Sequence, residues 1–131
     1  RQTMKPQGNC QWIMTNLLTE DKPLDGAESI GCCLRTAIIH KAGLKIGFLG
    51  IAEHEWMGIL KNLEVDLVYL NYKRCATEYA KKLREEDNCD MVIALTHMRV
   101  NHDEKFAREV PGIDLVLGGH DHEYYILDVN H

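Results

Sequence analysis

The chain has 131 residues, a length that suits one domain and not two. Hydrophobic residues make up 45% and charged residues 27% of the sequence, which excludes a disordered or fibrous chain. Fifteen Lys and Arg against 20 Asp and Glu give a formal net charge of −5. This acidic balance argues against a nucleic acid polymer as a partner, because surfaces that bind such polymers are basic.

No apolar run approaches the ~20 residues of a membrane-spanning helix, so we expect no membrane span. Residues 1–9 are polar and lack the apolar region that signal peptides carry, so we expect none at this end. The five cysteines include no C-x-x-C pair, and an odd number cannot all pair with one another. Unpaired thiols favour a reducing compartment and hence an intracellular location.

The first half of the chain begins with a short apolar segment at residues 10–18 and a polar loop at 19–26. The pattern then predicts a β-hairpin at 35–51 and a further short strand at 66–70. The hairpin has the clearest pattern. Residues 35–41 and 44–51 are both rich in β-forming side chains, and only Ala42-Gly43 separates them.

The second half predicts a helix followed by a buried strand. Apolar residues at 76, 79, 80 and 83 recur at the spacing of one helix face, while charged residues occupy the other face. Residues 90–95 are then almost entirely apolar. This pattern is typical of a strand buried on both faces of a parallel sheet, so we expect Leu95 to be buried.

A second helix and strand follow. Asn101 and Glu104 have the spacing of a capping box, which predicts a short helix that Pro111-Gly112 ends. Residues 113–117 predict another buried strand. Strand, helix and strand in this order form a βαβ unit, whose strands are parallel.

The predicted topology brings two histidine-bearing loops together. His97 follows the strand at 90–95, and His120 follows the strand at 113–117. Functional sites in open α/β sheets lie outside the carboxyl ends of parallel strands. We therefore expect the two loops to meet.

The stretch Gly118-Gly-His-Asp-His122 carries the clearest chemical signal. If this segment is extended, His120 and His122 point to the same side, and the two glycines allow the backbone to turn. With His97, three imidazoles would converge, and imidazole is a common ligand of zinc and iron and also serves manganese. The alternative is a set of hydrogen-bonded loop histidines without a metal.

The motifs around these histidines resemble a known family. Residues 94–99 (ALTHMR) and 110–122 (VPGIDLVLGGHDH) look like the carboxyl-terminal half of the catalytic domain of calcineurin-like metallophosphoesterases, and most of all the 5'-nucleotidase group. The hairpin at 38–51 and the segment 10–16 (CQWIMTN) resemble the same group. The resemblance implies an α/β fold, as part of a four-layer α/β/β/α sandwich whose βαβ unit carries the histidine loops.

The resemblance also implies a site with two divalent metal ions, of zinc, manganese or iron. By position, His97 and His120 match ligands of the second ion, and His122 matches a ligand of the first. The family's upstream D-x-H, G-D and G-N-H-[ED] motifs do not occur here, since Gly8-Asn9 lacks the following His. No catalytic residue is therefore assigned.

Residues 1–131 are thus interpreted as the downstream half of a phosphoesterase domain, with the remainder supplied by the same gene or by another chain. The intact protein is expected to hydrolyse phosphate esters, nucleotides among them, and the segment alone is expected to be inactive because half of the ligands are missing. The competing hypothesis is a non-catalytic scaffold or interaction module that retains the fold.

Other residues have simpler interpretations. Glu53 and His54 follow a predicted strand and could approach the site, although a solvated loop is the default. A second group comprises Asp114 and Asp121, which could hold the imidazoles in one tautomer, Asp121 being the weaker candidate for a direct ligand. We expect core packing from the helically spaced apolar residues Trp56, Met57, Ile59 and Leu60, and surface positions for His102 and His131.

Overall fold

The structure is a computed structural model that describes residues 10–19, 29–59 and 67–129. Most of the predicted polar loop, the stretch 1–9, Leu60, Asp66 and His131 lie outside the described residues. No helix in the described part of the chain is long and apolar enough to cross a bilayer.

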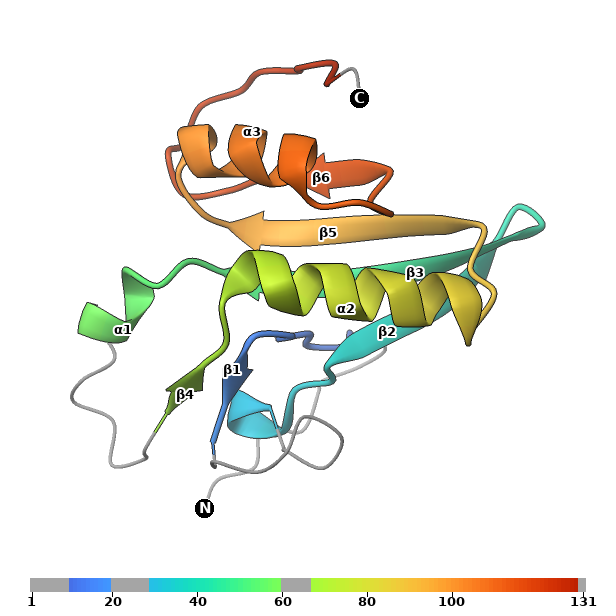
Figure 1. Ribbon diagram of the computed structural model, residues 1–131, viewed down its shortest axis with the longest axis horizontal. Helices are drawn as coiled ribbons and strands as arrows, with labels where there is room; N and C mark the ends of the chain where they lie inside the picture. The colour runs from blue at the N-terminus through green and yellow to red at the C-terminus, as the bar shows by residue number, and fades with distance from the viewer. Residues whose placement is uncertain (1–9, 20–28, 60–66, 130–131) are drawn as a thin grey trace.

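Four strands form the main sheet, in the order β2-β3-β5-β6, and β1 and β4 form a small antiparallel sheet beside it (Figure 1). The described elements are, in chain order, β1 (Leu17–Leu18), a 3-10 turn η1 (Ile30–Cys32), β2 (Thr36–Lys41), β3 (Leu44–Ala52), α1 (Trp56–Ile59), β4 (Val68–Tyr69), α2 (Tyr72–Glu85), β5 (Met91–His97), α3 (Val100–Glu109) and β6 (Leu115–Leu117).

The predicted hairpin is confirmed. Strands β2 and β3 pair antiparallel from Thr36 with Leu49 to Lys41 with Leu44. Ala42 and Gly43 join them with φ values of 52° and 81°, because a two-residue turn that matches the strand twist needs left-handed residues.

The predicted βαβ unit is also confirmed. Helix α3 connects β5 to β6, and these strands pair parallel with Leu95 beside Leu117. Strand β3 pairs parallel with β5 on the other side. The carboxyl ends of β3, β5 and β6 therefore share one edge of the sheet, on the left in Figure 1, where α1 also lies.

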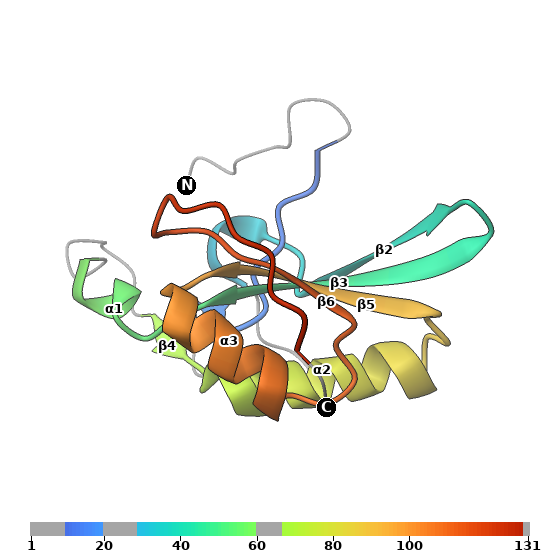
Figure 2. The same ribbon diagram turned by 90° about the horizontal axis from the view of Figure 1, so that it is seen from above.

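Both long helices pack on the same face of the main sheet (Figure 2). The core between them includes fully buried residues from the sheet and from each helix: Leu49, Val92, Ala94, Ala76, Ala80, Leu83 and Phe106. Alternate residues of β3 and β5 supply the sheet's part of this core, as the two-residue period of a strand requires. The α/β fold class is confirmed.

The opposite face of the sheet corrects one expectation. The sequence predicts that β5 is buried on both faces and that β6 is a buried strand, yet Leu95, Leu115 and Leu117 are 38%, 39% and 48% exposed. The reason is that no helix in the described part of the chain covers this face (Figure 2). Ile39 and Leu44 of the hairpin, at the other edge of the sheet, are also exposed.

The start of α3 corrects another expectation. The helix begins at Val100 with Arg99 as its N-cap, so Asn101 and Glu104 lie inside the helix and form no capping box. The first backbone N–H group is satisfied instead by Asp121, whose Oδ2 accepts a hydrogen bond of 2.7 Å from Val100 N. A carboxylate at a helix N-terminus is also favoured by the helix dipole.

Candidate metal site at the carboxyl ends of the strands

The two histidine-bearing loops meet, as the topology predicts. His97 is the last residue of β5, and His120 follows β6 by three positions. Their ring centroids lie 5.3 Å apart and their ring planes are inclined by 71°. Because residues two apart on a strand share a face, His97 lies on the same side of the sheet as the exposed Leu95.

The backbone of the second loop differs from the expected extended segment. His120 and His122 have φ values of 106° and 58°, and both lie in the left-handed region that side chains other than glycine rarely adopt. The sharp turns therefore occur at the histidines and not at Gly118 or Gly119. Such strained residues cluster at functional sites, where the surrounding structure holds them in place.

Gly118 is required for a different reason, which is its close approach to Asp103. A Cβ atom at position 118 would lie 2.4 Å from Asp103 Oδ2. The Asp103 side chain is buried, and its Oδ1 and the hydroxyl of Thr96 have no hydrogen-bond partner in the described structure. Burial raises the pKa of the Asp103 carboxyl to about 6.

Trp56 forms a wall of the site and does not contribute to the core. Its ring centroid lies 4.7 Å from that of His97 and 5.2 Å from that of His120. Its Nε1 donates a 2.9 Å hydrogen bond to the backbone oxygen of His97. The expected core role is wrong, because α1 contains no buried residue and Ile59 is 67% exposed.

Glu53 and His102 form a pair that the sequence did not reveal. Glu53 directly follows β3 and is only 3% exposed, and its Oε2 lies 2.5 Å from His102 Nδ1. The backbone N–H of Arg99 also donates to Glu53 Oε2, at 3.4 Å. His102 lies at the surface as expected, with 41% of its side chain exposed, but it also supplies a partner for the buried Glu53 carboxylate.

A bidentate ion pair lies beside this buried carboxylate. Arg99 Nε and Nη2 lie 2.9 and 2.6 Å from the two carboxylate oxygens of Glu55. The hydrogen bond from Arg99 lowers the pKa of Glu55, and the same contact raises the pKa of Arg99. Because both side chains are largely exposed, this pair fixes geometry more than it adds stability.

The remaining acidic and histidine candidates have structural partners. Asp114 accepts hydrogen bonds from Val92 N and from Arg84 at the amino end of β6, so it lies away from the imidazoles that it was thought to orient. Asp121 accepts the hydrogen bond from Val100 N through Oδ2, and its Oδ1 lies 4.0 Å from His120 Nε2, so it remains close to one imidazole. His54 is exposed, and its ring packs edge-on against Tyr69 at 4.9 Å.

The spacing of His97 and His120 suits two of the ligands of a single metal ion. Two imidazoles that share a tetrahedral zinc ion through bonds of ~2.1 Å have ring centroids about 5 Å apart, which is close to the observed separation. The described residues contain no group of three His, Cys, Asp or Glu side chains that could hold an ion. His122 is exposed, and no contact between its ring and the pair is described.

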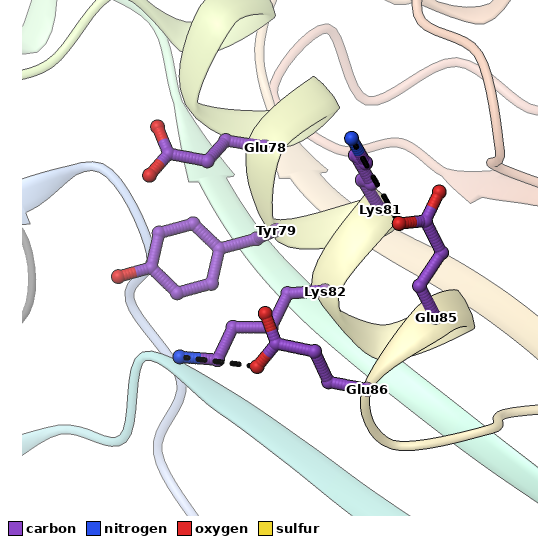
Figure 3. A pocket seen from close by; sticks show the side chains of 6 residues that line it. All are labelled: Glu78, Tyr79, Lys81, Lys82, Glu85 and Glu86. Carbon is purple, nitrogen blue, oxygen red and sulfur yellow. Dashed lines mark ion pairs between the residues drawn. The ribbon is translucent and has the colours of Figure 1, made fainter.

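The hollows on the surface of the described chain include the following two. One of about 710 Å³ adjoins the site and lies between α3, β6 and residues 118–129, with His120 and His122 at one end. The other, of about 250 Å³, lies along α2 (Figure 3). Figure 3 shows that its lysines pair with glutamates of the same helix, Lys81 with Glu85 and Lys82 with Glu86, as expected for a solvated helix face.

Comparison with known proteins identifies relatives in sequence and in fold, although no protein-family model matches the chain. An apyrase of Tabanus yao is 30% identical over 91 residues, which make up 69% of this chain and 16% of that protein. The trifunctional nucleotide phosphoesterase protein YfkN of Bacillus subtilis is 39% identical over 56 residues, or 43% of this chain and 4% of that protein.

The fold has a counterpart among solved structures. The NAD nucleotidase NadN of Haemophilus influenzae matches 92% of this chain with a TM-score of 0.73 and 18% sequence identity. The match covers 23% of the NadN chain, so this chain spans less than a quarter of the length of each of these three relatives. Sequence and fold together confirm the resemblance of this chain to the carboxyl-terminal region of the 5'-nucleotidase-like metallophosphoesterases.

Proposed function

We propose that this chain is the downstream half of the catalytic domain of a metal-dependent phosphoesterase that hydrolyses nucleotides. His97 and His120 bind one divalent ion, and His122 contributes to a second. The observation that carries the proposal is the placement of two imidazoles 5.3 Å apart at the carboxyl edge of a parallel sheet. Nucleotides are the proposed substrates because YfkN and NadN are named for a nucleotide phosphoesterase and an NAD nucleotidase.

The remainder of the domain covers the exposed apolar face of the main sheet. That face presents Leu95, Leu115 and Leu117, and an apolar surface of this kind is unfavourable in water. His97 opens onto the same side, so the missing ligands come from the part of the domain that packs there. The low coverage of the relatives supports this arrangement.

The residues of this chain hold one side of the site. His97 and His120 supply neutral nitrogen ligands, and the loop after β6 is anchored to α3 through Asp121. Bound divalent ions, whether zinc, manganese or iron, would supply Lewis-acid stabilisation of the phosphoryl group. The carboxylate ligands that such ions also require come from outside this chain.

The second candidate is a scaffold that retains the fold without activity. It is favoured by one observation, which is that no third ligand joins the pair among the described residues. The two candidates differ in the metal content of the complete protein. A scaffold binds no stoichiometric metal through these imidazoles.

The test is elemental analysis of the full-length protein that contains these residues, together with its His97→Ala and His120→Ala variants. We expect each substitution to lower the metal content and nucleotide hydrolysis together, while the melting temperature changes little because both imidazoles lie partly exposed at strand ends. His40→Ala is the matched control, since His40 is an exposed histidine of β2. Unchanged metal content with a lowered melting temperature would show that the imidazoles are structural.

A further inference from the structure

Residues 53–56, which directly follow β3, are attached to residues 97–102 by a series of contacts. Glu53 contacts His102 at 2.5 Å, and Glu55 forms the bidentate ion pair with Arg99. Trp56 completes the series by donating to the backbone oxygen of His97. Because each of these contacts joins the segment after β3 to the segment after β5, they fix the position of Trp56 relative to His97.

The indole of Trp56 contacts both members of the histidine pair. The centroid distances of 4.7 Å to His97 and 5.2 Å to His120 place the three rings within mutual contact. The indole lies tilted by 55° against His97 and edge-on against His120. Ring contacts of this kind restrict the rotation of both imidazoles.

We propose that Trp56 is a positioning residue that holds His97 and His120 ready to share one metal ion. The proposal rests on the proposed function, since it takes these imidazoles to be ligands. The hydrogen bond of Trp56 fixes the backbone of His97, and its ring limits the side-chain rotamers of both histidines. Ligands that are ordered before the ion arrives lose less conformational freedom on binding, so the affinity for the ion is higher.

The experiment uses the full-length protein labelled with 5-fluorotryptophan, which keeps the indole N–H group. The fluorine resonance that is missing in Trp56→Phe is assigned to Trp56. We expect this resonance to shift when zinc is added, and to stay unshifted in the His97→Ala/His120→Ala double variant. The readout is independent of hydrolysis.

The affinity of the variants supplies the second readout. Trp56→Phe keeps an aromatic ring and removes the hydrogen-bond donor, and we expect it to raise the zinc Kd about tenfold, as loss of a group that orients a ligand does. Trp56→Leu removes both features and raises the Kd further. Ile59→Ala is the matched control, because Ile59 lies on the same helix and is 67% exposed. We expect the zinc Kd of Ile59→Ala to stay at the wild-type value.

Two results overturn the proposal in distinguishable ways. If zinc binds through the two histidines but the Trp56 resonance does not shift, or Trp56→Phe binds zinc as tightly as wild type, Trp56 has no positioning role and the proposed function stands. If the histidine double variant binds as much zinc as wild type, the proposed metal ligands are wrong, and both proposals fail together. If Trp56→Leu does not fold, the proposal is still tested by the shift of the Trp56 resonance in the unsubstituted protein and by the zinc Kd of Trp56→Phe.

Discussion

Asp103 is a carboxyl group that burial makes hard to ionise. Its pKa rises from 3.8 to about 6, chiefly through desolvation, against an opposing effect of the nearby Thr96 hydroxyl, while the Glu53 and Asp121 charges raise the pKa further. A folded-state pKa above the unfolded value means that the folded protein binds the proton more tightly. The associated stability is therefore present below about pH 4 and is lost as the pH rises through 6.

Because the ionised carboxyl is disfavoured in the folded protein, we predict that Asp103→Asn stabilises the metal-free protein at pH 7, by about 3 kcal/mol. The amide keeps the shape of the carboxyl and carries no charge to desolvate. Urea unfolding at pH 5 and pH 7 measures the effect, and the variant should lose the decline in stability between these values. Asp128→Asn, at an exposed position, is the control. A destabilised Asp103→Asn at pH 7 would mean that the ionised carboxylate is satisfied in the folded protein.

At the residue scale, contacts that follow from the positions of strand ends could be predicted from the sequence, whereas contacts that depend on side-chain direction could not. His97 and His120 could be predicted to meet, because each directly follows a parallel strand. The Glu53–His102 pair could not, because its members lie 49 positions apart and one sits on a helix. The sequence did offer one signal for Glu53. It directly follows β3, and the carboxyl end of β3 lies beside that of β5, where His97 is located.

At the element scale, the strands and helices were predictable because their apolar periods are regular, and their ends were less so. The start of α3 depends on Asp121, which lies 21 positions from Val100, so no local capping motif could reveal it. The exposure of β6 could not be predicted either, because it depends on which other parts of the chain cover the sheet. An all-apolar strand has two faces to bury, and the described chain supplies helices for only one of them.

The exposed face of the main sheet leads to a prediction about Leu117. Although Leu117 is 48% exposed, we expect Leu117→Ala to destabilise the complete domain by ~2–4 kcal/mol, as truncation of a buried leucine does. Leu49→Ala, at a fully buried position on the helix-covered face, is the matched comparison with a cost of similar size. Urea midpoints of the full-length variants measure both values. A cost for Leu117→Ala below about 0.5 kcal/mol, typical of a surface substitution, would show that nothing covers this face.

At the scale of the whole described structure, a buried core lies on one face of the main sheet, and exposed leucines and the histidine pair lie on the other. The core cluster is formed by residues of α2, α3, the main sheet and the adjoining loops, all of which belong to this chain. The site is different, because two imidazoles alone cannot hold the ions of a two-metal hydrolase. Under the proposed function, activity therefore requires ligands from outside this chain, whereas the buried core does not.

This separation predicts that the 131-residue chain by itself does not hydrolyse phosphate esters, even with added manganese or zinc. The two-metal reaction requires carboxylate ligands in addition to imidazoles, and the described residues offer no group of three ligands. The measurement compares hydrolysis of an aryl phosphate and of nucleotides by this chain and by the full-length protein under the same metal concentrations. Hydrolysis should appear only in the longer protein, and His120→Ala should remove it there. Metal-dependent hydrolysis by the short chain that is lost in His120→Ala would contradict the prediction, because residues 1–131 would then contain a complete catalytic site.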